Sequence, residues 1–392
     1  MSYGETISLP ELERDPYPVY ARLRDEEPVA WVPAVRLWLV TRYDDVLAVN
    51  HAPEVFTAES DPSTLNRTLG RNMLGSDGPY HEWLRSITEP PFRPRAVEQR
   101  TQGMIPELAH QLIDGFAEQG ACDLFTEFCD PMSVRMLRFM LGMDEVPWQD
   151  LLRWNQGIMV GAANFEGDPD KQRVADAASA ALGAAIERIL ERLQAEPDGS
   201  VLAWMLHQER DGRRMAREEI VANARLILSG GLQEPRDLIA LTMWALGSHP
   251  DQLEQVRGDR LLIRRAVEET LRWAGPVGTA TRQTTRAAEL AGVELPEGAL
   301  VGAVLSSANR DPRHWTDPDR FDLHRQEGAH LAFAAGKHFC LGAWFGRYLA
   351  RVSLDVLLDR LPGLRLDPER PVELHGWEFR APRSTWVLWE RA

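Results

Sequence analysis

The chain has 392 residues, a formal net charge of −15 and 44% hydrophobic residues, enough to build a large core. Such an excess of acidic groups argues against nucleic-acid binding. The cysteines, Cys122, Cys129 and Cys340, are too few for a disulfide framework and favour a reducing, cytoplasmic environment. Residues 1–18 lack a secretion signal and no run of 18 apolar residues occurs, so we expect neither a membrane anchor nor a membrane span.

The pattern of apolar residues predicts a mainly α chain with small β-sheets at its edge, an α+β fold. No linker or repeat divides it, so we expect one domain over residues 1–392. In chain order, the expected elements are strands at 29–32 and 37–41, a helix at 43–50, a loop at 57–78, a helix from Pro79 to a break at Pro90, mostly helix over 97–141, a loop at 155–172, helices at 175–196 and 218–249, two strands within 289–301, and a helix at 341–361.

Cys340 lies in a glycine-bearing loop that runs from Phe333 to Gly342, just before a predicted amphipathic helix. The positive end of a helix dipole favours a thiolate over a thiol. Gly336 and Gly342 would remove side chains where a flat macrocycle passes close to the backbone. A thiolate held in this way is suited to be the axial ligand of a haem iron. A lone cysteine is more often a small buried hydrophobic residue, so the prediction depends on the spacing of the whole run.

This run has the pattern Phe-x-x-Gly-x-x-x-Cys-x-Gly and resembles the haem loop of the cytochrome P450 family. The resemblance covers essentially the whole chain. It implies the triangular, helix-rich P450 fold and a haem b (iron protoporphyrin IX) cofactor whose metal ligand is Cys340, with Phe333, Gly336 and Gly342 at the cofactor. It also implies oxidation of an organic substrate with dioxygen.

Glu269 and Arg272 lie three residues apart on one face of a predicted helix upstream of Cys340. Alone, such a pair is usually a surface ion pair. In the P450 family, a Glu and an Arg in this order lock the helix to the segment before the haem loop, and a second Arg completes the network. Here the second Arg is either Arg320 or Arg325. The resemblance therefore implies a buried network with a structural role.

Haem carries two propionates, which need cations at fixed places. His81 and Arg85 are four residues apart and would point the same way from one helix. The resemblance implies that they contact the propionates together with Arg282 and His338. Arginine suits a carboxylate because its guanidinium donates two parallel hydrogen bonds. For any one of these residues alone, a surface salt bridge is the simpler interpretation.

The central helix departs from the family pattern. Most P450 monooxygenases have Ala/Gly-Gly-x-Asp/Glu-Thr there, and the acid–alcohol pair helps to deliver protons. This chain has Gly230-Gly-Leu-Gln-Glu-Pro235, with Gln233 in place of the acid and Glu234 in place of the Thr. We expect Glu234 to handle protons, because a carboxyl in an apolar cavity has a raised pKa. Pro235 predicts a local opening of the helix. The alternative is a site that has lost monooxygenase activity.

The Gln-Glu-Pro sequence is similar to one subgroup, the P450s that O-demethylate guaiacol-type aromatics, and the run 376–382 also matches it. This implies a small aromatic substrate such as a methoxyarene, with Phe379 and Phe165 stacking on its ring and Gly230 nearby. Core packing is the alternative for each Phe. Other functions stay open: an H2O2-dependent peroxygenase, a natural-product tailoring hydroxylase, or a haem-binding sensor or scaffold without catalysis.

Electrons must come from another protein, because no flavin or iron–sulfur cysteine pattern is present. We expect an external ferredoxin or a flavin/iron–sulfur reductase, drawn to a basic patch behind Cys340. Scattered, solvated charges are the alternative. The candidate cations are Arg93, Arg95, Lys337, Arg347 and Arg351.

Overall fold

A computed structural model describes residues 2–61 and 63–391. The α-helices are Leu9–Arg14 (α1), Tyr17–Glu26 (α2), Tyr43–His51 (α3), Thr64–Leu69 (α4), Gly78–Thr88 (α5), Pro94–Thr101 (α6), Met104–Asp114 (α7), Asp130–Leu141 (α8), Trp148–Ala162 (α9), Pro169–Ala195 (α10), Val201–His207 (α11), Arg217–Gly247 (α12), Pro250–Gly258 (α13), Leu262–Ala274 (α14), Leu305–Ala308 (α15) and Ala343–Arg360 (α16). Four short 3-10 helices are Gly4–Thr6 (η1), Pro90–Phe92 (η2), Ala117–Gln119 (η3) and Gly336–His338 (η5), and Phe125–Cys129 (η4) is a π-helix. Within the described ranges, no helix is long and apolar enough to cross a membrane.

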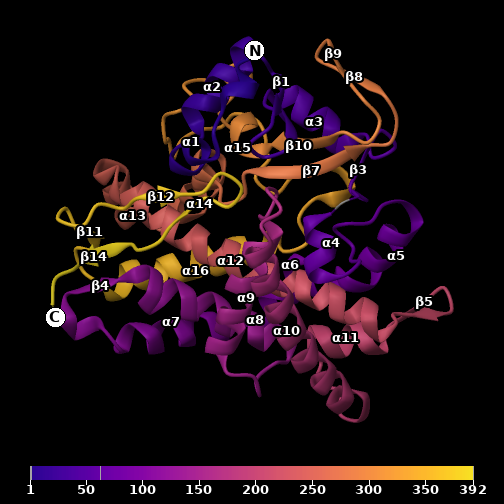
Figure 1. The fold of residues 1–392 in the computed structure, drawn as a ribbon. Coiled ribbons are helices and arrows are strands. Elements are labelled where there is room, and N and C mark those ends of the chain that lie inside the picture. Colours follow the sequence, from indigo (N-terminus) through magenta and orange to yellow (C-terminus); the bar gives the residue numbers. More distant parts are fainter. Residues whose placement is uncertain (1, 62, 392) are drawn as a thin grey trace.

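The strands form one larger sheet and several small ones. They are Val29–Val32 (β1), Leu37–Val40 (β2), Phe56–Thr57 (β3), Ala121–Asp123 (β4), Glu209–Arg210 (β5), Arg213–Arg214 (β6), Thr279–Thr284 (β7), Ala288–Leu290 (β8), Val293–Leu295 (β9), Leu300–Val304 (β10), Arg365–Leu366 (β11), Leu374–His375 (β12), Ala381–Pro382 (β13) and Trp386–Leu388 (β14). The larger sheet has the order β1-β2-β10-β7-β3, and only its β2–β10 pair is parallel. Figure 1 shows it beside the N-terminal helices at one end, with most long helices at the other.

Helix α12 runs through the centre of the helical region and packs against α8, α10, α14 and α16 (Figure 1). Apolar side chains buried around much of its circumference hold it there, as expected for a helix inside a core. The predicted opening at Pro235 is wrong, because α12 continues through this residue. Close packing on two sides holds the helix: a Cβ added to Gly231 would lie 3.1 Å from Leu137, and one added to Gly346 would lie 3.9 Å from the Pro235 ring.

Most expected elements are present, and the differences have local causes. The expected loop at 57–78 contains α4, whose first turn is capped by Ser63 Oγ accepting from the Asn66 N–H at 3.0 Å. The expected loop at 155–172 is helical at both ends, so only residues 163–168 separate α9 from α10. The expected helical stretch 97–141 is interrupted by β4, which pairs with β14 near the C-terminus. Because β14 is so distant in the sequence, no local pattern of apolar residues predicts this strand pairing.

Candidate active site

Cys340 follows a tight loop whose conformation depends on Gly336. The Cys340 N–H donates to the Phe333 carbonyl at 3.0 Å, and Gly336 has a φ of +69°. A Cβ on Gly336 would lie 2.5 Å from the Asn50 carbonyl oxygen of α3, so backbone conformation and this contact require the glycine. A Cβ on Gly342 would meet no heavy atom within 4 Å. The open space at Gly342 is compatible with the flat cofactor that we expected there, whereas the place of the cofactor at Gly336 stays a prediction.

The thiol of Cys340 does not become a thiolate through its position alone. Burial raises its pKa to about 11, although the N–H of Gly342 bonds to the sulfur and Arg85 and Arg347 lower the pKa. Helix α16 begins at Ala343, two residues later than expected. The expected dipole effect is thus outweighed by desolvation. A metal ion, by contrast, deprotonates a thiol that coordinates it.

Two of the four predicted propionate contacts are buried without an acidic partner. His81 on α5 is 3% exposed and its Nδ1 has no hydrogen-bond partner. Burial is the largest effect and the nearby His338 ring the second, and together they lower the pKa of His81 to about 4. Arg282 on β7 is 4% exposed and donates to the Thr281 carbonyl at 2.8 Å and to Asn50 Oδ1 at 3.3 Å. In the part of the chain that the structure describes, no carboxylate forms an ion pair with Arg282.

The other two cations are already paired. Arg85 Nε contacts Glu89 at 3.0 Å and the side chain is partly exposed. His338 Nε2 contacts Asp77 Oδ1 at 2.8 Å, and the His338 and His81 rings lie 4.3 Å apart. The folded chain thus brings His81 and His338, which are far apart in the sequence, into contact.

Asp77 is a residue that sequence reasoning missed. Its carboxylate accepts from the Thr57 hydroxyl at 2.6 Å, the Ala58 N–H at 2.6 Å and His338. Burial would raise its pKa, but the bonds from His338, Thr57 and Ala58 outweigh burial and lower the pKa to about 2. Asp77 therefore holds His338 and the segment after β3 in place. The available signal was an Asp directly before a helix that starts with Gly78-Pro79.

Glu234 lies on α12 with one oxygen that has no partner. Oε2 is buried and unbonded, and a Cβ on Gly230 would lie 3.4 Å from it, so the glycine makes room for the carboxyl. Burial raises the pKa of Glu234 to about 8. This agrees with the expected direction and makes Glu234 a neutral acid near pH 7. Gln233, the preceding residue, is partly exposed.

The two predicted substrate contacts lie in different surroundings. Phe379 is partly exposed and its backbone bridges to Val277 beside the start of β7. Phe165, between α9 and α10, packs its ring 5.7 Å from that of Trp377, in a cluster with the N-terminal helices. Among the described residues, the rings of Phe165 and Phe379 make no direct contact with each other, and the sandwich of a substrate ring between them stays a prediction.

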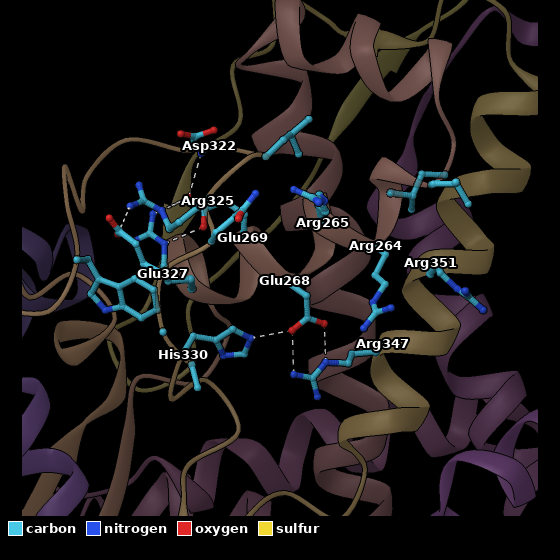
Figure 2. Close-up of a pocket in the computed structure, with 18 of the residues that line it drawn as sticks. Arg264, Arg265, Glu268, Glu269, Asp322, Arg325, Glu327, His330, Arg347 and Arg351 are labelled. Carbon is cyan, nitrogen blue, oxygen red and sulfur yellow. Dashed lines mark hydrogen bonds and ion pairs between the residues drawn. The ribbon is translucent and has the colours of Figure 1, made fainter.

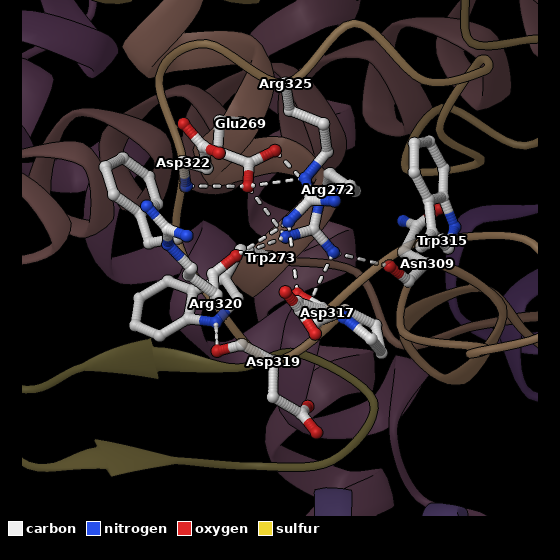
Figure 3. A network of polar contacts seen from close by, with 12 residues as sticks. Glu269, Arg272, Trp273, Asn309, Trp315, Asp317, Asp319, Arg320, Asp322 and Arg325 are labelled. Atoms are coloured by element: carbon white, nitrogen blue, oxygen red, sulfur yellow. Dashed lines mark hydrogen bonds and ion pairs between the residues drawn. The ribbon is translucent and has the colours of Figure 1, made fainter.

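The Glu269 network forms as the resemblance implied (Figure 3). Arg272 donates two bonds to Glu269, at 2.7 and 2.8 Å, and both side chains are buried. Arg325 completes the network at 3.1 Å from Glu269, whereas Arg320 contributes only its carbonyl, 3.0 Å from Arg272 Nη2. Of the two candidates for the second Arg, Arg325 is confirmed. The network ties α14 to the segment before the Cys340 loop.

The predicted basic patch is largely neutralised. Arg93, Lys337 and Arg347 pair with the acidic residues Glu89, Glu82 and Glu268 at 3.4, 2.6 and 2.6 Å. Of the five candidate cations, Arg95 and Arg351 are exposed and form no ion pair with any described residue.

A surface groove of about 1060 Å³ nevertheless carries cations that form no ion pair with any described residue. Figure 2 shows Arg264 and Arg265 on α14 facing the same region as Arg351 on α16, while Glu268 is occupied by Arg347 and His330. The groove also includes Phe339, which directly precedes Cys340 and is 41% exposed. An accessible cationic surface therefore exists here, centred on α14 as much as on α16.

The comparisons with known proteins agree with this geometry. The model of the cytochrome P450 family matches residues 167–362. The monooxygenase PikC of Streptomyces venezuelae is 35% identical over 99% of this chain and 96% of its own. The 6-deoxyerythronolide B hydroxylase of Saccharopolyspora erythraea is 30% identical over 92% and 93%. The structure of CYP109Q5 from Chondromyces apiculatus superposes with a TM-score of 0.88 at 29% identity, over 98% of this chain and 97% of that one, which confirms the predicted fold. The chain belongs to the cytochrome P450 family.

Proposed function

We propose that Cys340 is the thiolate ligand of haem iron in this monooxygenase and that His81 and Arg282 bind the propionates, with Arg85 and His338 beside them. The residues fit the group. Arg282 is a buried cation without a carboxylate, and the unbonded Nδ1 of His81 is free to donate to an anion. When bound, haem supplies the activation of dioxygen that oxidises the substrate. The reduced carbon monoxide complex should show the red-shifted Soret band of thiolate ligation, and a histidine-type band would contradict the assignment.

In the proposed mechanism, Glu234 supplies protons where most relatives use a Thr. Its raised pKa keeps the proton on the carboxyl of most molecules near pH 7, and this form acts as the general acid for dioxygen. The ionised form accepts a proton when H2O2 is the oxidant. The absence of a side chain at Gly230 leaves room for the Glu234 carboxyl itself, whose Oε2 lies 3.4 Å from the position of a Cβ there. Arg282, His81 and Cys340 fix the cofactor, and Glu234 moves protons.

The substrate that the comparisons favour is a natural product. Relatives of high coverage are named for such chemistry, among them 6-deoxyerythronolide B hydroxylase and the cyclomarin C epoxidase CymV of Salinispora arenicola. We therefore infer a tailoring hydroxylase that inserts one oxygen atom into a C–H bond of a large organic substrate. A substrate-induced spin-shift screen with macrolactones and cyclic peptides against small methoxyarenes tests this: tight binding of methoxyarenes alone would overturn it.

O-demethylation of a small methoxyarene is the second candidate. The observation that favours it is the partly exposed Phe379 ring on the turn next to Val277, together with the Gln-Glu-Pro sequence of α12. The position of Phe165 beside Trp377 weighs against a two-ring sandwich. Formaldehyde release from guaiacol-type compounds by the purified enzyme would establish this activity, and its absence with every methoxyarene that shifts the spin state would exclude it.

P450s receive electrons from redox partners, and we propose that an acidic ferredoxin or reductase docks on the groove between α14 and α16. Arg264, Arg265 and Arg351 supply charge complementarity, and Phe339 places the groove next to Cys340. The Arg264→Glu/Arg351→Glu variant should slow reductase-driven turnover and weaken its salt dependence, while H2O2-driven turnover stays constant. Arg217→Glu, outside the groove, is the control. Equal rates for both variants would exclude this surface.

A further inference from the structure

The further inference concerns Glu378, a buried carboxyl that the proposed mechanism does not use, and it rests on the proposed contact of Phe379 with the substrate. Glu378 is 9% exposed, and its carboxyl accepts a hydrogen bond from the Thr279 hydroxyl at the start of β7. Among the described residues, it forms no ion pair with a cation. A buried carboxyl without a cation costs stability that an apolar side chain would not. Its presence therefore indicates a role beyond packing.

The turn that carries Glu378 is clamped by its backbone to the segment just before β7. The Gly278 N–H donates to the Glu378 carbonyl at 2.7 Å, and the Arg380 N–H donates to the Pro276 carbonyl at 2.9 Å. A Cβ on Gly278 would lie 1.9 Å from the Trp377 carbonyl oxygen, so the close approach of the two segments requires the glycine. The backbone of the turn is thus fixed beside the residue whose hydroxyl holds the Glu378 side chain.

Three successive residues of this turn contact different parts of the molecule. Trp377 is 3% exposed, and its ring lies 5.7 Å from that of Phe165, in the loop between α9 and α10. Glu378 reaches Thr279 on β7, whereas Phe379 is partly exposed. Successive side chains of an extended segment point to opposite sides. The bond that holds Glu378 on the inner side therefore also sets the direction of the Phe379 ring.

The titratable groups that face Glu378 from neighbouring elements do not neutralise its charge. Tyr20 on α2 is fully buried, its hydroxyl has no hydrogen-bond partner, and both Glu378 and Tyr17 raise its pKa. The cation of the turn, Arg380, donates to two backbone carbonyls and lies 3.8 Å from Asp15. Burial raises the pKa of Glu378 to about 7, and the bond from the Thr hydroxyl offsets burial only in part.

We propose that Glu378 is the positioning residue for the substrate contact of Phe379: its neutral carboxyl, bonded to Thr279, anchors the turn and presents the ring to the substrate. Ionisation places an uncompensated charge in a buried site, so the carboxylate moves toward water and the turn loosens. Substrate affinity then falls as the pH rises through about 7, because the neutral form holds the turn.

The affinity of the haem-loaded enzyme for an aromatic probe, 4-phenylimidazole, tests this pH dependence. Glu378→Gln keeps an acceptor for the Thr279 hydroxyl but cannot ionise. The ratio of the wild-type dissociation constant to that of the variant should rise from about 1 at about pH 6 to at least about 3 at about pH 8.5. Titration of the probe itself and of other groups in the protein cancels in this ratio.

The matched control is Glu373→Gln, because this carboxylate belongs to the same C-terminal segment but is 77% exposed. Its dissociation constant should follow that of the wild type at every pH. A ratio for Glu378→Gln that stays constant over the whole pH range, or an equal change in both variants, would overturn the proposal.

Removal of the hydrogen bond tests the anchor itself. Thr279→Val should weaken probe binding at least about threefold, and Thr279→Ser, which keeps the hydroxyl, should retain the wild-type affinity. In the Phe379→Ala background, Thr279→Val should have no further effect, because the ring that the anchor positions is absent. Additive effects of the two substitutions would contradict the positioning role.

The same variants separate this inference from the proposed function. If Phe379→Ala leaves the affinity for the probe unchanged, the substrate contact itself fails. If Phe379→Ala weakens binding but Glu378→Gln and Thr279→Val behave like the wild type, only the positioning role of Glu378 fails. Haem content and thermal unfolding of each variant show that the affinities are compared between folded proteins.

Discussion

Two ionic clusters in the interior of the described chain differ in character. In the Glu269 cluster, both carboxylate oxygens are bonded: Oε1 accepts from Arg272, Arg325 and the Asp322 N–H, and Oε2 accepts from Arg272 Nε at 2.8 Å. In the α12 cluster, one oxygen of Glu234 and one of Asp237 have no partner. A fully satisfied network is rigid and stabilises the native geometry, whereas buried acceptors without partners are retained at a cost in stability. We therefore assign the first cluster a structural role and propose a role in proton transfer for the second.

The largest expected effect is a loss of stability when the fully bonded Glu269 cluster is broken. Arg272→Ala leaves the buried Glu269 charge without its main partner, so the free energy of unfolding should fall by about 3–5 kcal/mol. Chemical denaturation followed by circular dichroism measures this. The control is Arg22→Ala, which removes an ion pair with Glu26 at 2.9 Å whose side chains are 53% and 55% exposed. That variant should lose less than about 1 kcal/mol. Equal losses would show that burial of the network does not matter.

A substitution at Glu234, in the cluster with unbonded oxygens, should change the catalytic activity. Glu234→Gln keeps the shape and removes the titrating proton, so H2O2-driven product formation should fall by at least ~10-fold while the substrate spin shift is retained. Glu234→Thr should restore reductase-driven turnover in preference to the peroxide reaction. Product formation with each oxidant is compared at matched haem content. Normal turnover of Glu234→Gln with both oxidants would mean that the residue is structural.

The unsatisfied carboxyl should also make stability depend on pH in a defined direction. Because burial raises the pKa of Glu234 to about 8, the folded state holds a proton that the unfolded state releases near pH 4.5. Stability should therefore fall as pH rises from about 4.5 to about 8, and Glu234→Gln should flatten this slope. Thermal unfolding at several pH values measures it. Glu378, which accepts from the Thr279 hydroxyl and has its pKa raised to about 7 by burial, provides a comparison: Glu378→Gln should flatten only the part below pH 7.

The smallest expected effect concerns substrate affinity and tests the proposed contact of Phe379 with the substrate. Phe379→Ala should weaken the binding of an aromatic substrate by about 0.5–1.5 kcal/mol, the value of one stacking contact, and leave the haem content unchanged. Spin-shift titration measures the dissociation constant. Phe165→Ala is the matched variant, and because its ring packs on Trp377 we expect it to change thermal stability more than affinity. Unchanged affinity of Phe379→Ala for every aromatic ligand would make this residue part of the core.

The amino-acid sequence determined those features that depend on short spacing. The run Phe333–Gly342, the Glu269–Arg272 pair and the carboxyl at Glu234 are each contained within ten residues of one loop or helix. Helical geometry places the last two, and the spacing within one loop defines the first. The direction of one pKa shift followed as well: burial raises the pKa of Glu234, as the apolar surroundings of α12 predicted.

Only the tertiary structure decided which distant residues meet. Asp77 reaches His338 across 261 positions, Asp130 reaches Arg236 across 106, and β4 pairs with β14, so no local pattern reveals these contacts. Packing also overruled local rules: α12 continues through Pro235 because α8 and α16 enclose it, and burial outweighs the helix dipole at Cys340. Local periodicity specifies which elements form, whereas desolvation and long-range partners are properties of the assembled core and set the protonation of its carboxyls and thiol.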